Sequence, residues 1–202
     1  VEPNVSMGAL VEKTLTFELI PPVVMELPGI TVGGGIQGGA GESSSFKYGN
    51  FFDCCLEYEI VLGNGDILEV SREKNSDLFW GTACSYGSLG IITLVKMNLI
   101  PSKKFMHLTY HRVRSFSEAI RTIEKNVHQP VDYVDGILFS ENLGVIMIGN
   151  LENNKKNLPV TTFLNATDEW FYLHAEDKTK RYARYEEVIP IKDYLFRYDR
   201  GG

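Results

Sequence analysis

The sequence predicts an α+β fold in two parts that meet near residue 103. Apolar and polar residues alternate along 51–62, and the dipeptide Asn64-Gly65 follows, as expected for an antiparallel hairpin. After residue 103, the patterns of a strand, a helix and two more strands follow one another, as in half of a split α+β domain. Between 27 and 49, glycine and serine are so frequent that we expect an irregular loop instead of a regular element.

The composition is that of an ordinary globular protein. The chain has 202 residues, of which 44% are hydrophobic and 23% charged, enough for a buried core. Its net charge of -6 argues against general electrostatic binding to nucleic acid. No apolar run approaches the ~20 residues that cross a bilayer, and the start Val1-Glu2-Pro3 has no features of a signal peptide.

The cysteines indicate neither a disulfide framework nor a metal site. There are three of them, Cys54, Cys55 and Cys84, and two are adjacent. No spacing of cysteine and histidine resembles a zinc site, so no metal is expected. We predict buried, reduced thiols.

The first part, to about residue 103, is expected to begin with a strand end, a short helix capped by Ser6 and a short strand. The hairpin then consists of a strand over 51–62, a type I′ turn at Asn64-Gly65 and a return strand over 67–70. A helical turn, a second glycine-rich loop and a last strand complete this part, over 75–80, 81–90 and 91–100.

The second part, 104–202, begins with a strand over 105–113. Ser115 and Glu118 form a capping box, which predicts a helix from that point. Its apolar face consists of Phe116, Ala119, Ile120, Ile123 and Val127. Two strands, a polar linker and one more helix, capped by Thr167, are expected over 131–139, 145–151, 152–158 and 168–182.

The glycine-rich segment has three interpretations. Residues 33–38 match G-x-G-x-x-G, and Asp53 stands 20 residues after Gly33, as in a Rossmann dinucleotide site. We reject that interpretation because so many glycines follow that no stable helix is expected there. The second is a loop whose backbone N–H groups, with the hydroxyls of Ser43, Ser44 and Ser45, bind a phosphate-bearing ligand. The third is a surface loop without a ligand.

Three groups of residues resemble the FAD loops of the vanillyl-alcohol oxidase / p-cresol methylhydroxylase (PCMH) flavoproteins. They are the runs 28–34, 41–49 and 75–93, which keep the family's order and spacing over about 100 residues. The resemblance implies that 1–103 is the second subdomain of a PCMH-type FAD-binding domain and that 104–202 begins an α+β substrate (cap) domain. The implied FAD-binding residues are Thr31, Val32, Gly33, Gly34, Gly35, Ile36, Gln37, Gly38, Gly39, Ala40, Gly41, Glu42, Ser43, Ser44, Tyr48, Gly87, Gly90, Ile91 and Ile92.

A narrower resemblance is to the Δ24-sterol reductases, the Diminuto/seladin group. It rests on the runs 41–49, 73–79, 100–104, 170–171 and 187–194. It implies reduction of a C=C bond in a sterol side chain, with FAD held noncovalently and NADPH as the electron donor. It also implies the endoplasmic reticulum membrane as the location in a eukaryote, and the cytoplasm otherwise.

The family pattern extends beyond this sequence. Its first FAD subdomain lies before the part that matches Val1, and its substrate domain continues past the part that matches Gly202. We therefore expect a fragment, with the missing FAD subdomain supplied by the full-length chain. Two other functions stay open: an FAD-dependent oxidase or dehydrogenase of a hydroxyl substrate, and a noncatalytic fragment.

Reduction of a C=C bond requires a proton donor beside the flavin. The candidates are Tyr194, Arg197, Tyr198 and Asp199, for each of which a purely structural role is the alternative. The apolar run 170–173 allows contact with a sterol or a membrane, and packing inside the substrate domain is the alternative.

Overall fold

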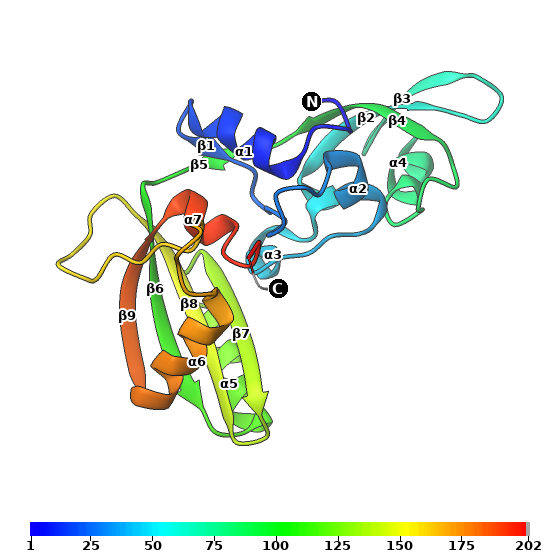
Figure 1. Cartoon of the computed structure of the whole chain (residues 1–202). Helices are drawn as coiled ribbons and strands as arrows, with labels where there is room; N and C mark the ends of the chain where they lie inside the picture. Colours follow the sequence, from blue (N-terminus) through cyan, green and yellow to red (C-terminus); the bar gives the residue numbers. More distant parts are fainter. Residues whose placement is uncertain (201–202) are drawn as a thin grey trace. The chain divides into compact units, whose positions relative to one another are not determined.

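The computed structural model describes residues 1–200 and divides the chain into two compact units, Val1–Pro101 and Ser102–Gly202 (Figure 1). Both contain helices and antiparallel sheets, which confirms the α+β prediction. The predicted boundary near residue 103 falls at this division, and the assignment of a domain to each unit stays a prediction. Among the described residues, no helix is long and apolar enough to cross a bilayer.

The first unit begins with helix α1 (Met7–Leu15), as predicted, capped by the side chain of Ser6, which accepts a hydrogen bond from the Ala9 amide. Strand β1 (Leu19–Ile20) follows and pairs with β5 (Ile100–Pro101), so the beginning and the end of this unit are tied together.

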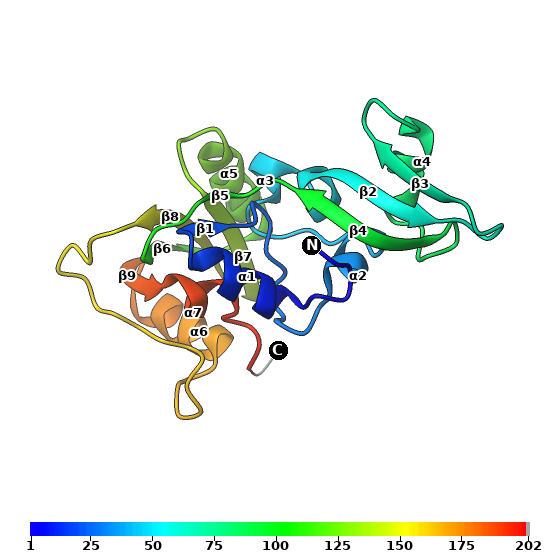
Figure 2. The same cartoon turned by 90° about the horizontal axis from the view of Figure 1, so that it is seen from above.

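The predicted hairpin is confirmed. Strands β3 (Ile67–Ser71), β2 (Cys55–Val61) and β4 (Ile91–Met97) form an antiparallel sheet in that order, and Figure 2 shows β2 beside β4. The predicted type I′ turn is wrong, because Gly65 has a positive φ of +90° while Asn64 does not. A bulged turn over 62–66 closes the hairpin instead.

The predicted strand start at residue 51 is also wrong. Residues Phe51–Cys54 form a 3-10 turn, η1, and a register shift lies between Cys55 and Glu57. The alternation predicts that Leu56 shares the apolar face with Tyr58 and Ile60 and that Cys55 lies on the wetter face. Because of this irregularity, Cys55 is instead buried and Leu56 is exposed.

The expectation that 27–49 contains no regular element is corrected by two short helices, α2 (Val32–Gln37) and α3 (Ser45–Tyr48). Helix α2 forms in spite of its three glycines because Thr31 caps it and because Val32, Gly35 and Ile36 are buried in the unit. Tertiary contacts thus outweigh the low helix propensity of glycine.

Helix α4 (Ser76–Thr82) lies after β3, near the predicted helical turn. Phe79 stacks on Tyr58 of β2, with ring centroids 4.8 Å apart, and Arg72 lies over the ring of Trp80. These contacts fix the helix against the sheet.

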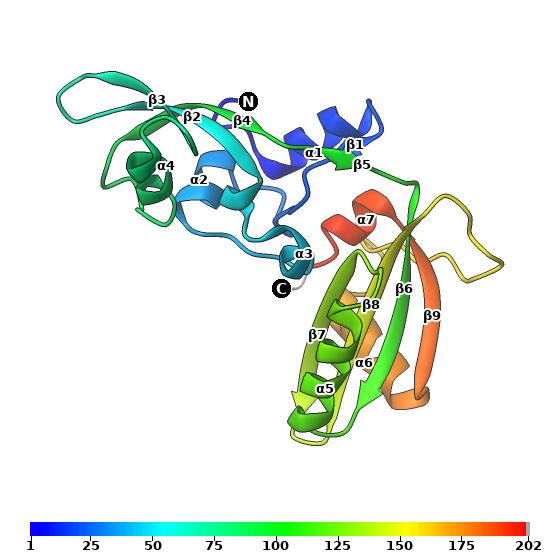
Figure 3. The ribbon, with the colours of Figure 1, turned by 180° about the vertical axis from the view of Figure 1, so that it is seen from behind.

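The second unit is a four-stranded antiparallel sheet in the order β7-β8-β6-β9. Its strands are β6 (Phe105–Val113), β7 (Tyr133–Ser140), β8 (Leu143–Glu152) and β9 (Arg184–Pro190). Helix α5 (Phe116–Val127) packs on one face and α6 (Phe171–Arg181) on the other, as Figure 3 shows from the α5 side. The predicted cap of α5 is confirmed, since Ser115 accepts from the Glu118 amide. The predicted capping box is not complete, because the Glu118 carboxylate accepts from the Arg114 amide instead of the Ser115 amide.

The sequence prediction fails at the end of this unit. Helix α6 begins at Phe171 after Trp170, so Thr167 is not its cap. Strand β9 and helix α7 (Ile191–Leu195) were not predicted at all. Strand β9 was missed because a buried Glu187 interrupts its apolar pattern.

Candidate cofactor-binding site

Helix α2 presents a face without side chains. Gly34 and Gly38 are one turn apart and both exposed, with Thr31 just before them. The opposite side of the helix holds the buried Val32 and Ile36. A Cβ added at Gly34 would meet only the Thr31 hydroxyl, at 3.0 Å. The bare face therefore leaves room for a ligand to approach the backbone closely.

The predicted nest of free amides needs a correction at 32–34. The Val32 amide donates to Val5 O (3.0 Å), the Gly33 amide to Pro3 O (2.8 Å) and the Gly34 amide to Thr31 Oγ1 (3.1 Å). These donors hold α2 to the rest of the unit, so they are not available to a phosphate. A ligand on this face would contact glycine surface instead of these N–H groups.

The serine hydroxyls after α2 also differ from the prediction. Ser44 is fully buried and its hydroxyl donates to Pro22 O at 2.8 Å. The Ser45 hydroxyl accepts the Glu42 amide, and the Glu42 carboxylate accepts the Glu26 amide at 3.1 Å. These bonds fold 42–45 against 22–26 and shape the loop, so Ser44 and Ser45 are engaged with their own chain.

The two predicted FAD segments meet in space. The Cys84 amide donates to Ile36 O and the Tyr86 amide to Gln37 O, both at 3.2 Å. The Gln37 side chain donates to Gly90 O at 3.4 Å. The glycine-rich helix and the loop before β4 therefore form one continuous surface within the first unit.

The remaining predicted residues in this unit take several positions. Gly87 has a positive φ of +78°, and a Cβ at Gly90 would lie 2.6 Å from Val61 O. The course of the backbone therefore favours glycine at both positions. Ile92 is buried and Ile91 is 70% exposed. Tyr48 is half-buried, with the Lys47 ammonium 5.3 Å from its ring centre.

The surface fits a flat, phosphate-bearing cofactor in one respect. Exposed glycine backbone, whose open space any Cβ would fill, lies where α2 meets the loop before β4. Among residues 1–200, no group of three or more metal-ligating side chains is placed to hold an ion.

The structure separates the four predicted proton donors by burial. Tyr194 and Arg197 belong to the interior of the second unit. Arg197 pairs with Asp135 at 2.6 Å, and the Tyr198 hydroxyl donates to the same carboxylate at 3.2 Å. Asp199 is exposed.

Arg197 is enclosed by aromatic rings. Its guanidinium lies 4.3 Å from the ring centre of Tyr194, 4.7 Å from that of Tyr198 and 5.2 Å from that of Phe171. A cation among three rings and a carboxylate binds the end of the chain to the sheet. The sequence drew attention to Arg197 without indicating Asp135, which is 62 residues earlier.

Sequence reasoning did not find the buried cluster around Glu187. This carboxylate, fully buried on β9, accepts hydrogen bonds from Tyr110 and Thr161, both at 2.5 Å, and contacts His174 Nε2 at 3.0 Å. Burial alone would raise the pKa of Glu187, but its bonds to His174, Thr161 and Tyr110 hold that pKa below its ordinary value. Burial and the nearby Glu187 raise the pKa of Tyr110.

The apolar run 170–173 is partly packed inside the second unit and partly exposed. Phe171 is buried against Phe163, with ring centroids 5.0 Å apart. Trp170 and Leu173 are exposed, by 43% and 39%. Packing inside the unit thus explains Phe171 and does not explain the two exposed side chains.

Comparison with known proteins shows what the sequence is similar to. Residues 1–71 match the family described as "FAD binding domain". Over the whole chain, the sequence is 35% identical to the Delta(24)-sterol reductase of Homo sapiens, covering 99% of this chain and 39% of that protein. It is 33% identical to the Delta(24)-sterol reductase of Pisum sativum, covering 99% and 38%.

A third relative has a different name. Cytokinin dehydrogenase 9 of Oryza sativa subsp. japonica is 28% identical over 140 residues, 68% of this chain and 27% of that protein. Residues 1–71 are thus similar to an FAD binding domain. Over its whole length, the chain is similar to the Delta(24)-sterol reductases, of whose length it spans about two fifths.

Proposed function

We propose that this chain is part of an FAD-dependent oxidoreductase that reduces a C=C bond in a sterol side chain with NADPH as electron donor. The observation that carries the proposal is the extent of the similarity. It covers 99% of the chain, including the second unit, which lies outside the matched FAD binding domain.

The first unit would hold the cofactor. The exposed backbone at Gly34 and Gly38 admits the flat parts of FAD, and the loop before β4 borders that surface. Bound FAD supplies hydride transfer, which protein side chains cannot perform. The chain's own contribution is a close-fitting surface held rigid by the hydrogen bonds of Val32, Gly33 and Gly34.

The second unit would supply the proton. Of the four candidates, Tyr198 is partly exposed and carries a hydroxyl, whereas Tyr194 and Arg197 are enclosed in the interior. We propose Tyr198 as the donor, oriented by Asp135. The sterol, and a location at the endoplasmic reticulum membrane in a eukaryote or in the cytoplasm otherwise, belong to this proposal through the same relatives.

An FAD-dependent dehydrogenase or oxidase is the second candidate, favoured by the match to a cytokinin dehydrogenase. One assay separates the two. The intact gene product is incubated with FAD, NADPH and a sterol with an unsaturated side chain, and mass spectrometry detects the gain of two hydrogens. If no reduced sterol forms while an alcohol or amine substrate is oxidised without NADPH, the reductase proposal is wrong. If neither reaction occurs, the noncatalytic alternative is favoured.

A further inference from the structure

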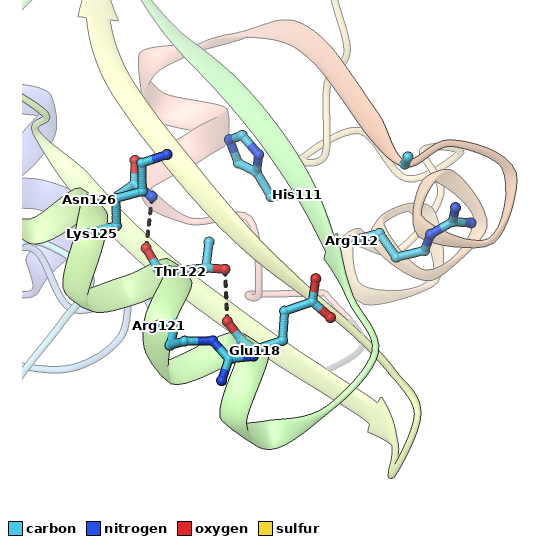
Figure 4. Close-up of a pocket in the computed structure, with 8 residues that line it drawn as sticks. His111, Arg112, Glu118, Arg121, Thr122, Lys125 and Asn126 are labelled. Atoms are coloured by element: carbon cyan, nitrogen blue, oxygen red, sulfur yellow. Dashed lines mark hydrogen bonds between the residues drawn. The ribbon is translucent and has the colours of Figure 1, made fainter.

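The second unit contains a polar groove beside α5 that the proposed function does not use. It lies on the face of the sheet opposite to Glu187 and Arg197, between α5 and the edge formed by β6 and β9 (Figure 4). Its volume is about 370 Å³. His111 lines it from β6, and Glu118, Arg121, Thr122, Lys125 and Asn126 line it from α5.

The cations of the groove have no anionic partner. Among residues 1–200, the side chains of Arg121 and Lys125 form no hydrogen bond or ion pair. Glu186 pairs with both His107 and Arg184, each at 2.8 Å, and the groove-lining Glu118 accepts the Arg114 amide but keeps its negative charge. The two cations Arg121 and Lys125 exceed the single charge of Glu118, so a net positive charge faces the groove.

The neutral side chains of the groove are held in place. Thr122 and Asn126 donate to backbone carbonyls of their own helix, which fixes the side of α5 that borders the groove (Figure 4). His111 is half-buried, and its pKa is lowered by burial and by the cations Arg184 and Lys125, although Glu186 opposes them. An imidazole in that position is a neutral N–H donor at pH 7.

Arg112 is not part of this charge. Arg112 borders the groove, but its guanidinium projects away from α5 (Figure 4) and lies 3.5 Å from Thr179 O at the end of α6.

We propose that this groove binds a phosphate monoester, with Arg121 and Lys125 as its charged contacts and His111 as a neutral donor. A doubly charged, three-oxygen group matches two cations and an N–H that line one groove. The 2′-phosphate of NADPH and the headgroup of an anionic lipid both present this chemistry. Only the first of these sources rests on the proposed function.

The test measures binding of inorganic phosphate and of 2′-AMP to this protein by calorimetry at low ionic strength. Two charged hydrogen bonds of ordinary strength predict a Kd of about 1 mM or below. Arg121→Gln and Lys125→Gln should each weaken binding about tenfold. Lys180→Gln is the matched control, because Lys180 is an exposed lysine of α6 outside the groove, paired with Glu176, and it should leave the Kd unchanged.

Absence of saturable binding, or equal affinity in the groove variants and the control, overturns the proposal. Shifts of the α5 amides in NMR spectra on phosphate addition report the site independently of the variants, and shifts confined to other residues also overturn it. NADPH binding more tightly than NADH identifies the dinucleotide as the source of the phosphate. Binding to phosphatidic acid vesicles without that preference identifies the lipid. FAD binding and sterol reduction, assayed separately, are expected to survive failure of this proposal.

Discussion

The two units use polar groups in opposite ways. In the first, the surface around α2 is made of backbone and glycine, and its backbone amides bond to backbone carbonyls and to the Thr31 hydroxyl. In the second, charged side chains are taken into the interior, where Glu187 and Arg197 join segments far apart in sequence. The difference teaches that the absence of side chains leaves the backbone of α2 open in one unit, while buried charged side chains join distant segments in the other.

The largest effect is expected at Glu187. Glu187→Ala would leave Tyr110, Thr161 and His174 without their shared acceptor in a buried site. Breaking such a cluster typically lowers the free energy of unfolding by about 3–5 kcal/mol. Urea unfolding measures it, with Glu187→Gln as the isosteric control that keeps an acceptor. Losses below about 1 kcal/mol in Glu187→Ala would show that the cluster is not what holds β9 to α6.

A smaller effect is expected from a glycine with a structural role. A Cβ at Gly33 would lie 2.8 Å from Pro3 Cβ, and the ring of proline yields little. Gly33→Ala should therefore lower the free energy of unfolding by about 1–3 kcal/mol, the usual cost of overpacking. Gly34→Ala on the bare face should change it by about 1 kcal/mol or less. Equal losses in both variants would contradict the division of α2 into a packed and an open side.

The pH dependence sharpens the role assigned to Glu187. Because its pKa is lowered in the folded state, its contribution is fully present above its ordinary value of 4.5 and is lost as the pH falls through the folded pKa. The wild type should therefore lose stability on acidification more steeply than Glu187→Gln. Parallel curves for the two proteins would mean that Glu187 is not ionised when folded.

The smallest effect concerns thiols, since it leaves stability unchanged. The prediction of buried thiols is confirmed for Cys54 and Cys55 and is wrong for Cys84, which is exposed. Burial raises the pKa of Cys54 to about 11 and that of Cys55 to about 12. A thiol reagent at pH 8 should modify one cysteine quickly and the other two only on unfolding. Cys84→Ser should remove the fast phase, and a fast phase that persists would place a reactive thiol elsewhere.

Local patterns in the sequence predicted much of the fold. The hairpin of β2 and β3, strand β6 and the Ser115 cap of α5 depend on neighbouring residues, and all three are confirmed. Features set by distant contacts were not predictable in this way. Helix α2 depends on packing and on Val5 and Pro3, which no propensity scale includes.

The candidate site shows the same limit. The glycine pattern located the surface, and the order of the two glycine-rich segments indicated that they act together. The sequence could not show which amides of α2 are already hydrogen-bonded, because the acceptors at Pro3 and Val5 lie about 30 residues before their donors. Glu187 was overlooked as a cluster centre, since its partners Tyr110, Thr161 and His174 lie on three other segments.

The central claim is that the bare face of α2 holds FAD, and Gly34→Val tests it most directly. The variant is compared with wild type and with Gly63→Val, whose added Cβ meets nothing within 4 Å in the hairpin turn. FAD affinity of the intact gene product is measured by flavin absorbance, together with thermal unfolding. We predict that Gly34→Val binds FAD at least about tenfold more weakly while remaining folded, and that Gly63→Val binds it normally. Wild-type affinity for FAD in Gly34→Val would contradict the account.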